Sequence, residues 1–273
     1  MKTLVVGDTH LKQKLVLPRV DALVDWHGAG HVVFLGDYCD EWSSSDGELM
    51  DELSFFAGWV GSARAAGLRV DVLLGNHDYQ YLLGGEGPGT HGFMMKEVRA
   101  LLLELDPVIA AAVDGFLLTH AGLTNEWAAR YLDGPEDAVQ ARDQLNALFE
   151  GDAPEDLRAL FARGAMRGGW DVPGPLWADL SELADDPCVG LDQIVGHTPV
   201  YTCGLMPLTD AGGPAGGCKL CACDTFSLTS SLVPIGDGSM VLIDGGRVVV
   251  VGGEDDDLEP WDSAVLNWAC AAR

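Results

Sequence analysis

The sequence has few basic residues and no long apolar run. It contains 16 lysine and arginine residues against 42 aspartate and glutamate residues, a formal net charge of -26. An acidic surface disfavours nucleic acid and anionic membranes as partners, because both carry negative charge. The longest apolar runs, within 31–36 and 247–253, are far shorter than the ~20 residues that cross a bilayer. We therefore expect no membrane span and no nucleic-acid partner.

Cysteine is scarce, and its seven residues are odd in number. Most have apolar neighbours, which is typical of reduced thiols in the cytosol. The chain begins directly with a predicted strand that leads to candidate metal ligands, which indicates no signal peptide and a cytoplasmic protein. A structural zinc site is the alternative for four closely spaced thiols, Cys203, Cys218, Cys221 and Cys223. Their spacing matches no common zinc motif, so we favour free thiols.

The 273 residues are 48% hydrophobic, which is enough for a sizeable core. Apolar runs and helical spacing alternate at first, predicting strands 3–7, 31–36, 69–74, 107–113 and 116–119 and helices 14–29, 47–66 and 93–104. Residues 124–165 are predicted to be helical, as a cap or insertion over the site. The part from 192 to 252 is β-rich, and a short helix follows near 261–271. No linker divides the chain, so we expect one α/β domain over 1–273, a two-sheet sandwich with helices outside.

Five short apolar runs each end on residues that bind hard metal ions. The ligand types are carboxylate, imidazole and amide: Asp8 and His10; Asp37 and Asp40; Asn76, His77 and Asp78; His120; and His197. Such runs before a glycine or turn are typical of buried strands. Because sites in open α/β sheets gather at the carboxyl ends of strands, these residues predict one metal site.

The ligands divide between two ions. Asp8 and His10 are two residues apart, which in a strand places them on one side, and we predict that they bind the first ion. Asp37 is the predicted bridge, and the second ion takes Asn76, His120 and His197. This mixed ligation suits Mn²⁺, with Fe or Zn²⁺ as alternatives. Two ions ~3.5–4 Å apart hold a hydroxide and clamp phosphate oxygens, so the sequence predicts phosphoester hydrolysis without a covalent intermediate.

Two further residues are candidates for proton transfer. His77 follows Asn76, and a protonated imidazole there would donate a proton to the leaving alkoxide. Asp40 lies three residues after Asp37 and is predicted to pair with His77 and raise its pKa. Asp78 is interpreted as a structural carboxylate near the site rather than a ligand.

These motifs resemble those of the calcineurin-like metallophosphoesterase superfamily. The matching patterns are D-x-H, G-D-x-x-D, G-N-H-[DE], H-[AG]-G and G-H-T-P, in the family's order over about residues 4–200. GDYCD, GNHD, THAGL and GHTPV are most similar to the branch that contains PPP-type serine/threonine phosphatases and bacterial diadenosine tetraphosphatases. The resemblance implies a four-layer α/β/β/α sandwich with two mixed sheets, a dinuclear site and the roles assigned above.

The chain departs from that branch at one position. The second aspartate of G-D-x-x-D is normally followed by an arginine that holds the substrate phosphate, but here Glu41 follows Asp40. Arg167 is the candidate replacement, since arginine suits bidentate phosphate contacts, and Arg163 is the second choice.

The substrate stays open at this point. We favour a PPP-like phosphomonoesterase that acts on a phosphorylated small molecule or a phosphoprotein. Hydrolysis of a dinucleoside polyphosphate or phosphodiester is the alternative, with a nucleotide as substrate. A catalytically silent metal-binding scaffold is a third hypothesis, which the complete ligand set disfavours.

Overall fold

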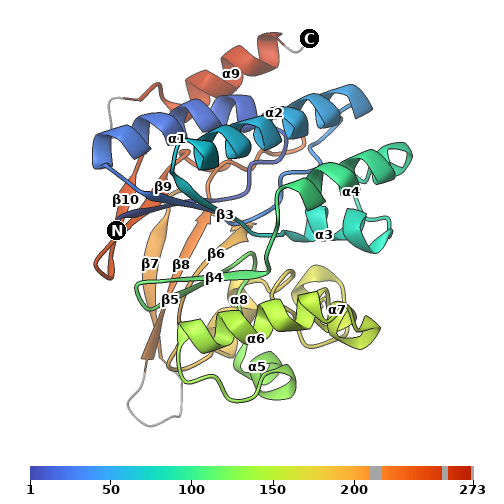
Figure 1. Ribbon diagram of the computed structural model, residues 1–273, viewed down its shortest axis with the longest axis vertical. Coiled ribbons are helices and arrows are strands. Elements are labelled where there is room, and N and C mark those ends of the chain that lie inside the picture. Colours follow the sequence, from blue (N-terminus) through green and yellow to red (C-terminus); the bar gives the residue numbers. More distant parts are fainter. Residues whose placement is uncertain (210–216, 254–257, 272–273) are drawn as a thin grey trace.

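The computed structural model describes residues 1–209, 217–253 and 258–271. Two five-stranded sheets lie face to face, and helices cover the outer face of each (Figure 1). The strand orders are β10-β9-β1-β2-β3 and β4-β5-β6-β8-β7. Among the described residues, no helix is both long enough and apolar enough to cross a membrane.

The first sheet contains the alternating part of the chain. Its strands are β1 (Thr3–Val6), β2 (His31–Phe34), β3 (Arg69–Val72), β9 (Met240–Asp244) and β10 (Arg247–Val251). β1 pairs in parallel with β2, and β2 with β3, whereas β9 runs antiparallel to β1. Its outer helices are α1 (Gln13–His27), α2 (Asp46–Ala65), α4 (Met95–Glu104) and α9 (Trp261–Ala271). The carboxyl ends of β1, β2 and β3 therefore meet at one edge.

Helix α2 illustrates how the sequence sets these elements. The Ser45 side chain accepts a hydrogen bond from the backbone N–H of Glu48, and the Glu48 carboxylate accepts one from the backbone N–H of Ser45. This capping box satisfies amides that have no partner within the helix. The apolar stripe of α2 is buried against the first sheet, at Leu49, Leu53, Phe56 and Val60.

The second sheet is mixed as well. Its strands are β4 (Ala110–Val113), β5 (Phe116–Thr119), β6 (Asp192–Pro199), β7 (Gly204–Thr209) and β8 (Gly217–Asp224). β5, β6 and β8 are parallel neighbours, so their carboxyl ends also share one edge. The two-residue hairpin turn between β4 and β5 has positive φ at Asp114 and Gly115, as the turns that favour hairpins require.

Three apolar layers hold the molecule together. One lies between the first sheet and its helices, one between the two sheets, and one between the second sheet and helices α5 (Asn125–Tyr131), α6 (Ala138–Glu150) and α7 (Pro154–Leu160). The sequence therefore predicted the architecture correctly: the protein is a four-layer α/β/β/α sandwich with two mixed sheets.

The predicted cap segment, 124–165, forms these last three helices. α6 packs on β4 and β5 and belongs to the outer helical layer of the second sheet. Between β5 and β6, the chain lines the cavity only after α7, within residues 163–179. The sequence analysis missed three short elements: α3 (Asn76–Leu83), α8 (Leu180–Asp185) and β7. α3 was overlooked because a glycine-rich loop follows it directly.

Of the four thiols considered for zinc, Cys203, Cys221 and Cys223 lie in the layer between the two sheets, whereas Cys218 does not. Cys221 and Cys223 lie on one face of β8, with their Sγ atoms 4.0 Å apart, in the layer between the two sheets. Cys218 is three residues from Cys221 in the same strand, so its side chain points to the opposite face. The six cysteines that the structure describes are free thiols.

Candidate metal centre

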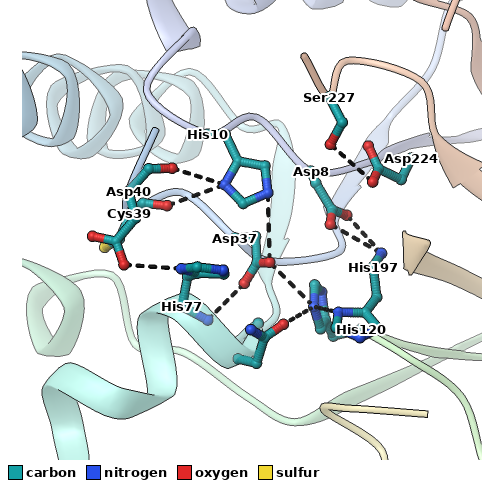
Figure 2. Close-up of polar contacts among 12 residues, drawn as sticks. Asp8, His10, Asp37, Cys39, Asp40, His77, His120, His197, Asp224 and Ser227 are labelled. Atoms are coloured by element: carbon teal, nitrogen blue, oxygen red, sulfur yellow. Dashed lines mark hydrogen bonds and ion pairs between the residues drawn. The ribbon is translucent and has the colours of Figure 1, made fainter. Parts of the chain in front are cut away.

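The predicted ligands meet where the carboxyl ends of both sheets come together. Asp8 follows β1, Asp37 follows β2, and Asn76 begins α3 after β3. His120 follows β5, and His197 lies near the end of β6. Figure 2 shows these side chains pointing toward one another, with Asp37 between His10 and His120. Segments almost 200 residues apart in the chain thus contribute to one site.

Two groups of side chains have ligand atoms within 4.8 Å of one another. The first contains Asp8, His10 and Asp37, and the second contains Asp37, His120 and His197. Asn76 joins the second group, because its Oδ1 lies 2.9 Å from Nε2 of His120. Asp37 is the member that both groups share, which is the position the sequence analysis gave it.

Backbone carbonyls orient two of the imidazoles. Nδ1 of His10 lies 2.9 Å from the carbonyl of Asp40, and Nδ1 of His120 lies 3.0 Å from that of Leu35. A carbonyl only accepts, so each Nδ1 carries the proton. In the neutral rings, the Nε2 lone pairs then point toward Asp37, at 3.6 and 3.4 Å from Oδ2. Acceptors that face one another in this way fit a cation between them.

The electrostatics of the buried site also favour a bound cation. Burial and the neighbouring charges of Asp224 and Asp37 raise the pKa of Asp8 well above its usual value. Burial lowers the pKa of His197 well below its usual value, with contributions from His120 and Arg167. Carboxylates and a neutral imidazole in a desolvated site are the donor set of a hard or borderline metal ion.

The backbone of the site is held in an uncommon conformation. His10, Asp37, Asp40 and His197 all have positive φ, between 39° and 63°. Non-glycine residues adopt this region at a cost, and such residues concentrate at functional sites. Asp8 and His10 therefore lie in a loop beyond the end of β1 rather than in a strand. Their side chains meet because of this loop and not because of strand alternation.

Asp78 stabilises the loop after β2. Its buried carboxylate accepts hydrogen bonds of 2.7–3.1 Å from four backbone N–H groups, those of Asp37, Tyr38, Cys39 and Gly75. Gly75 also has to lack a side chain, because a Cβ there would lie 2.1 Å from Oδ1 of Asp37. The predicted structural carboxylate thus fixes the position of Asp37.

His77 and Asp40 form the pair that the sequence indicated. Nδ1 of His77 lies 2.9 Å from Oδ2 of Asp40, and Gln80 and Tyr81 also donate to this carboxylate. Burial lowers the pKa of His77, but the Asp37 charge and the Asp40 hydrogen bond outweigh it and raise that pKa to about 9. The Nδ1 proton is committed to Asp40, which leaves Nε2 to exchange a proton with a substrate.

A cavity of about 410 Å³ opens over these residues. Arg167 lines it beside His197, and its Nη2 contacts Oγ1 of Thr198 at 2.8 Å and Oδ2 of Asp179 at 3.0 Å. Its buried Nε has no hydrogen-bond partner among the described residues. Arg163 lies instead over the ring of Trp177, at 4.2 Å. Of the two candidate arginines, the structure places Arg167 at the cavity.

Glu41 lines the same cavity without acting as a free negative charge. Its carboxylate is paired with Lys12, whose side chain is fully buried. Lys12 also donates to the backbone carbonyl of His10 at 2.8 Å. The pair links the loops after β1 and β2, and its charges cancel. Glu41, neutralised by Lys12, therefore lies at the position where the resemblance predicts an arginine.

One carboxylate of the cavity was not among the residues predicted from the sequence. Asp224 is the last residue of β8 and lines the cavity near Asp8 and His10. An apolar run, Leu220 to Cys223, precedes it directly. This is the pattern that identified the other strand ends, and it would have identified Asp224.

Comparisons with known proteins agree with this geometry. A family model described as calcineurin-like phosphoesterase matches residues 1–205. A search of curated proteins finds no match. Among solved structures, a cold-active protein-tyrosine phosphatase from a psychrophilic Shewanella species is similar, with a TM-score of 0.57, 20% identity, and coverage of 95% of this chain and 80% of that one.

A protein serine/threonine phosphatase from Saccharomyces cerevisiae is similar as well. Its TM-score is 0.50 at 16% identity, with 96% of this chain and 83% of that chain covered. At these identities, both structures show that the fold is shared.

Proposed function

The chain belongs to the calcineurin-like phosphoesterase family, and from that premise we propose that it hydrolyses phosphomonoesters with the help of two divalent metal ions. We assign one ion to Asp8, His10 and Asp37, and the other to Asp37, Asn76, His120 and His197. Mn²⁺ is the proposed metal, with Fe or Zn²⁺ as alternatives, because the donor set mixes carboxylate, amide and imidazole.

The observation that carries the proposal is the position of Asp37. Its carboxylate lies between two imidazoles whose Nε2 lone pairs face it, at 3.6 Å from His10 and 3.4 Å from His120. When bound, a pair of ions would lower the pKa of a bound water and neutralise phosphate oxygens.

The other residues of the cavity suit a phosphate ester. His77 would give a proton from Nε2 to the leaving oxygen, while Asp40 holds its Nδ1. The Arg167 guanidinium would bind phosphate oxygens that the metal ions do not contact. Asp179 and Thr198 hold this guanidinium in place, so phosphate binding requires little reordering of the Arg167 side chain.

We favour a PPP-like phosphomonoesterase, with phosphoproteins among its candidate substrates because the two similar structures are protein phosphatases by name. GDYCD, GNHD, THAGL and GHTPV support that branch. We also propose a cytoplasmic location, because free thiols at all six described cysteines fit a reducing compartment.

The first test compares two substrates. The protein is stripped of metal, Mn²⁺ is restored, and initial rates are measured on p-nitrophenyl phosphate and on bis(p-nitrophenyl) phosphate. We expect Mn²⁺-dependent turnover with a preference for the monoester. A preference for the bis ester would favour the phosphodiesterase alternative. No turnover on either substrate with two ions bound would contradict a general phosphomonoesterase.

A further inference from the structure

Asp224 lies at the edge of the metal centre but belongs to neither group of converging ligands. It ends β8, opposite Pro199 of β6, and His197 lies in the irregular stretch of β6 just before Pro199. β6 and β8 are parallel, so Asp224 lies at the same sheet edge as the predicted ligands. Figure 2 shows its side chain beside Asp8, and it lines the cavity.

One oxygen of this carboxylate lacks a partner. The residue is 1% exposed, and Oδ2 accepts a hydrogen bond of 2.9 Å from Ser227. Oδ1 is buried and has no hydrogen-bond partner among the described residues. Leaving a buried carboxylate oxygen without a donor or a counter-charge is costly. Its position in the cavity therefore requires a partner that the described residues do not supply.

The surroundings of Asp224 contain an excess of negative charge. Asp8 and Asp37 are buried carboxylates of the same site, and Figure 2 shows Asp8 beside Asp224. The buried lysine of this region, Lys12, is already paired with Glu41. A divalent cation would compensate these three carboxylates.

We propose that Asp224 is the third carboxylate of the cation position formed by Asp8, His10 and Asp37. Asp224 does not bind the cation directly. It acts by its negative charge and by accepting at Oδ1 a hydrogen bond from an ordered water. This indirect role follows from geometry, since Asp224 is in neither of the two groups within 4.8 Å. The inference rests on the proposed function, because it requires that a cation binds there.

The two cation positions then differ in chemistry. The first faces three carboxylates and one imidazole, whereas the second faces the shared Asp37, two imidazoles and one amide. Hard ions such as Mn²⁺ prefer oxygen ligands. Asp224 therefore makes the first position the tighter of the two for Mn²⁺.

The test is a calorimetric Mn²⁺ titration of the metal-free protein, with the wild type compared to Asp224→Asn. We expect two ions per wild-type chain in two affinity classes. In Asp224→Asn the tighter class should weaken by about 10–100-fold, the effect typical of residues that support metal ligands. Asp244→Asn is the charge-matched control, because Asp244 lies on an exposed strand end at the opposite edge of the sheet. It should leave both classes unchanged.

Thermal melting separates this role from a purely structural one. Asparagine is isosteric and removes a charge that Asp8 and Asp37 repel, so metal-free Asp224→Asn should melt at or above the wild-type temperature, while its stabilisation by Mn²⁺ shrinks. Ser227→Ala keeps the carboxylate and should change the tighter affinity far less.

Each contrary result has a distinct meaning. Unchanged Mn²⁺ affinity in Asp224→Asn, with two ions bound to the wild type, would overturn this inference and leave the proposed function intact. Equal weakening of both classes would overturn the assignment to the first position. Failure of the wild type to bind Mn²⁺ would overturn the proposed function itself.

Discussion

The substitution Asp78→Asn measures how strongly one carboxylate holds the loop that carries Asp37. Oδ1 of Asp78 accepts from Tyr38 and Cys39, and Oδ2 accepts from Asp37 and Gly75. Asparagine keeps the first oxygen but turns the second into an N–H₂ donor, which leaves two backbone N–H groups without an acceptor. The side chain is fully buried, so water does not replace the lost oxygen.

The magnitude follows from these two groups. Each unsatisfied buried donor costs about 1–3 kcal/mol, so the pair costs about 2–6 kcal/mol. Burial and the nearby Asp37 charge raise the pKa of Asp78, so the charged carboxylate is electrostatically unfavourable there. Asparagine removes that charge, which offsets part of the lost stability. We therefore expect the free energy of unfolding to fall by about 2–4 kcal/mol, a large share of the ~5–15 kcal/mol of a typical domain.

The assay is urea unfolding of the metal-free protein, with Asp244→Asn as an exposed control. A loss below about 1 kcal/mol would mean that one side of the carboxylate is sufficient, and the account of this loop would be wrong. Mn²⁺ affinity should fall in the same variant, because the loop places Asp37.

Three further substitutions test individual roles. Asp37→Asn should reduce bound metal, measured by elemental analysis, and activity together; near-normal turnover would contradict a bridging role. His77→Ala should retain its metal and lose ~10²–10⁴-fold in kcat, with a smaller loss for p-nitrophenyl phosphate than for an alkyl phosphate. If it loses metal instead, His77 is a ligand rather than the acid. Arg167→Ala should raise KM for phosphomonoesters by about 10–100-fold, the equivalent of one charged hydrogen bond, and an unchanged KM would remove Arg167 from phosphate binding.

The sequence indicated which residues come together where a residue follows a buried strand. The apolar runs before Asp37 and His120 indicate strands, and parallel strands must end at a common edge. Asp224 follows the same pattern in β8, but the run before it was considered only for its cysteines. The apolar run before Asp224 was therefore informative as well, and it indicates this residue without any family motif.

Other features depend on loop geometry that no local pattern encodes. Lys12 and Glu41 are 29 residues apart and pair only because the loops after β1 and β2 fold together. The meeting of Asp8 with His10 likewise depends on a positive φ at His10, not on strand alternation. The role of Asp78 as an acceptor for four amides requires the close packing of Gly36 against Gly75.

The most direct test of the central claim is a crystal of the protein soaked in Mn²⁺ and measured at the manganese absorption edge. The account predicts two anomalous peaks ~3.5–4 Å apart on either side of the Asp37 carboxylate. One peak should lie beside Asp8 and His10, and the other beside Asn76, His120 and His197. A single peak, or two peaks that do not share Asp37, would contradict the dinuclear site.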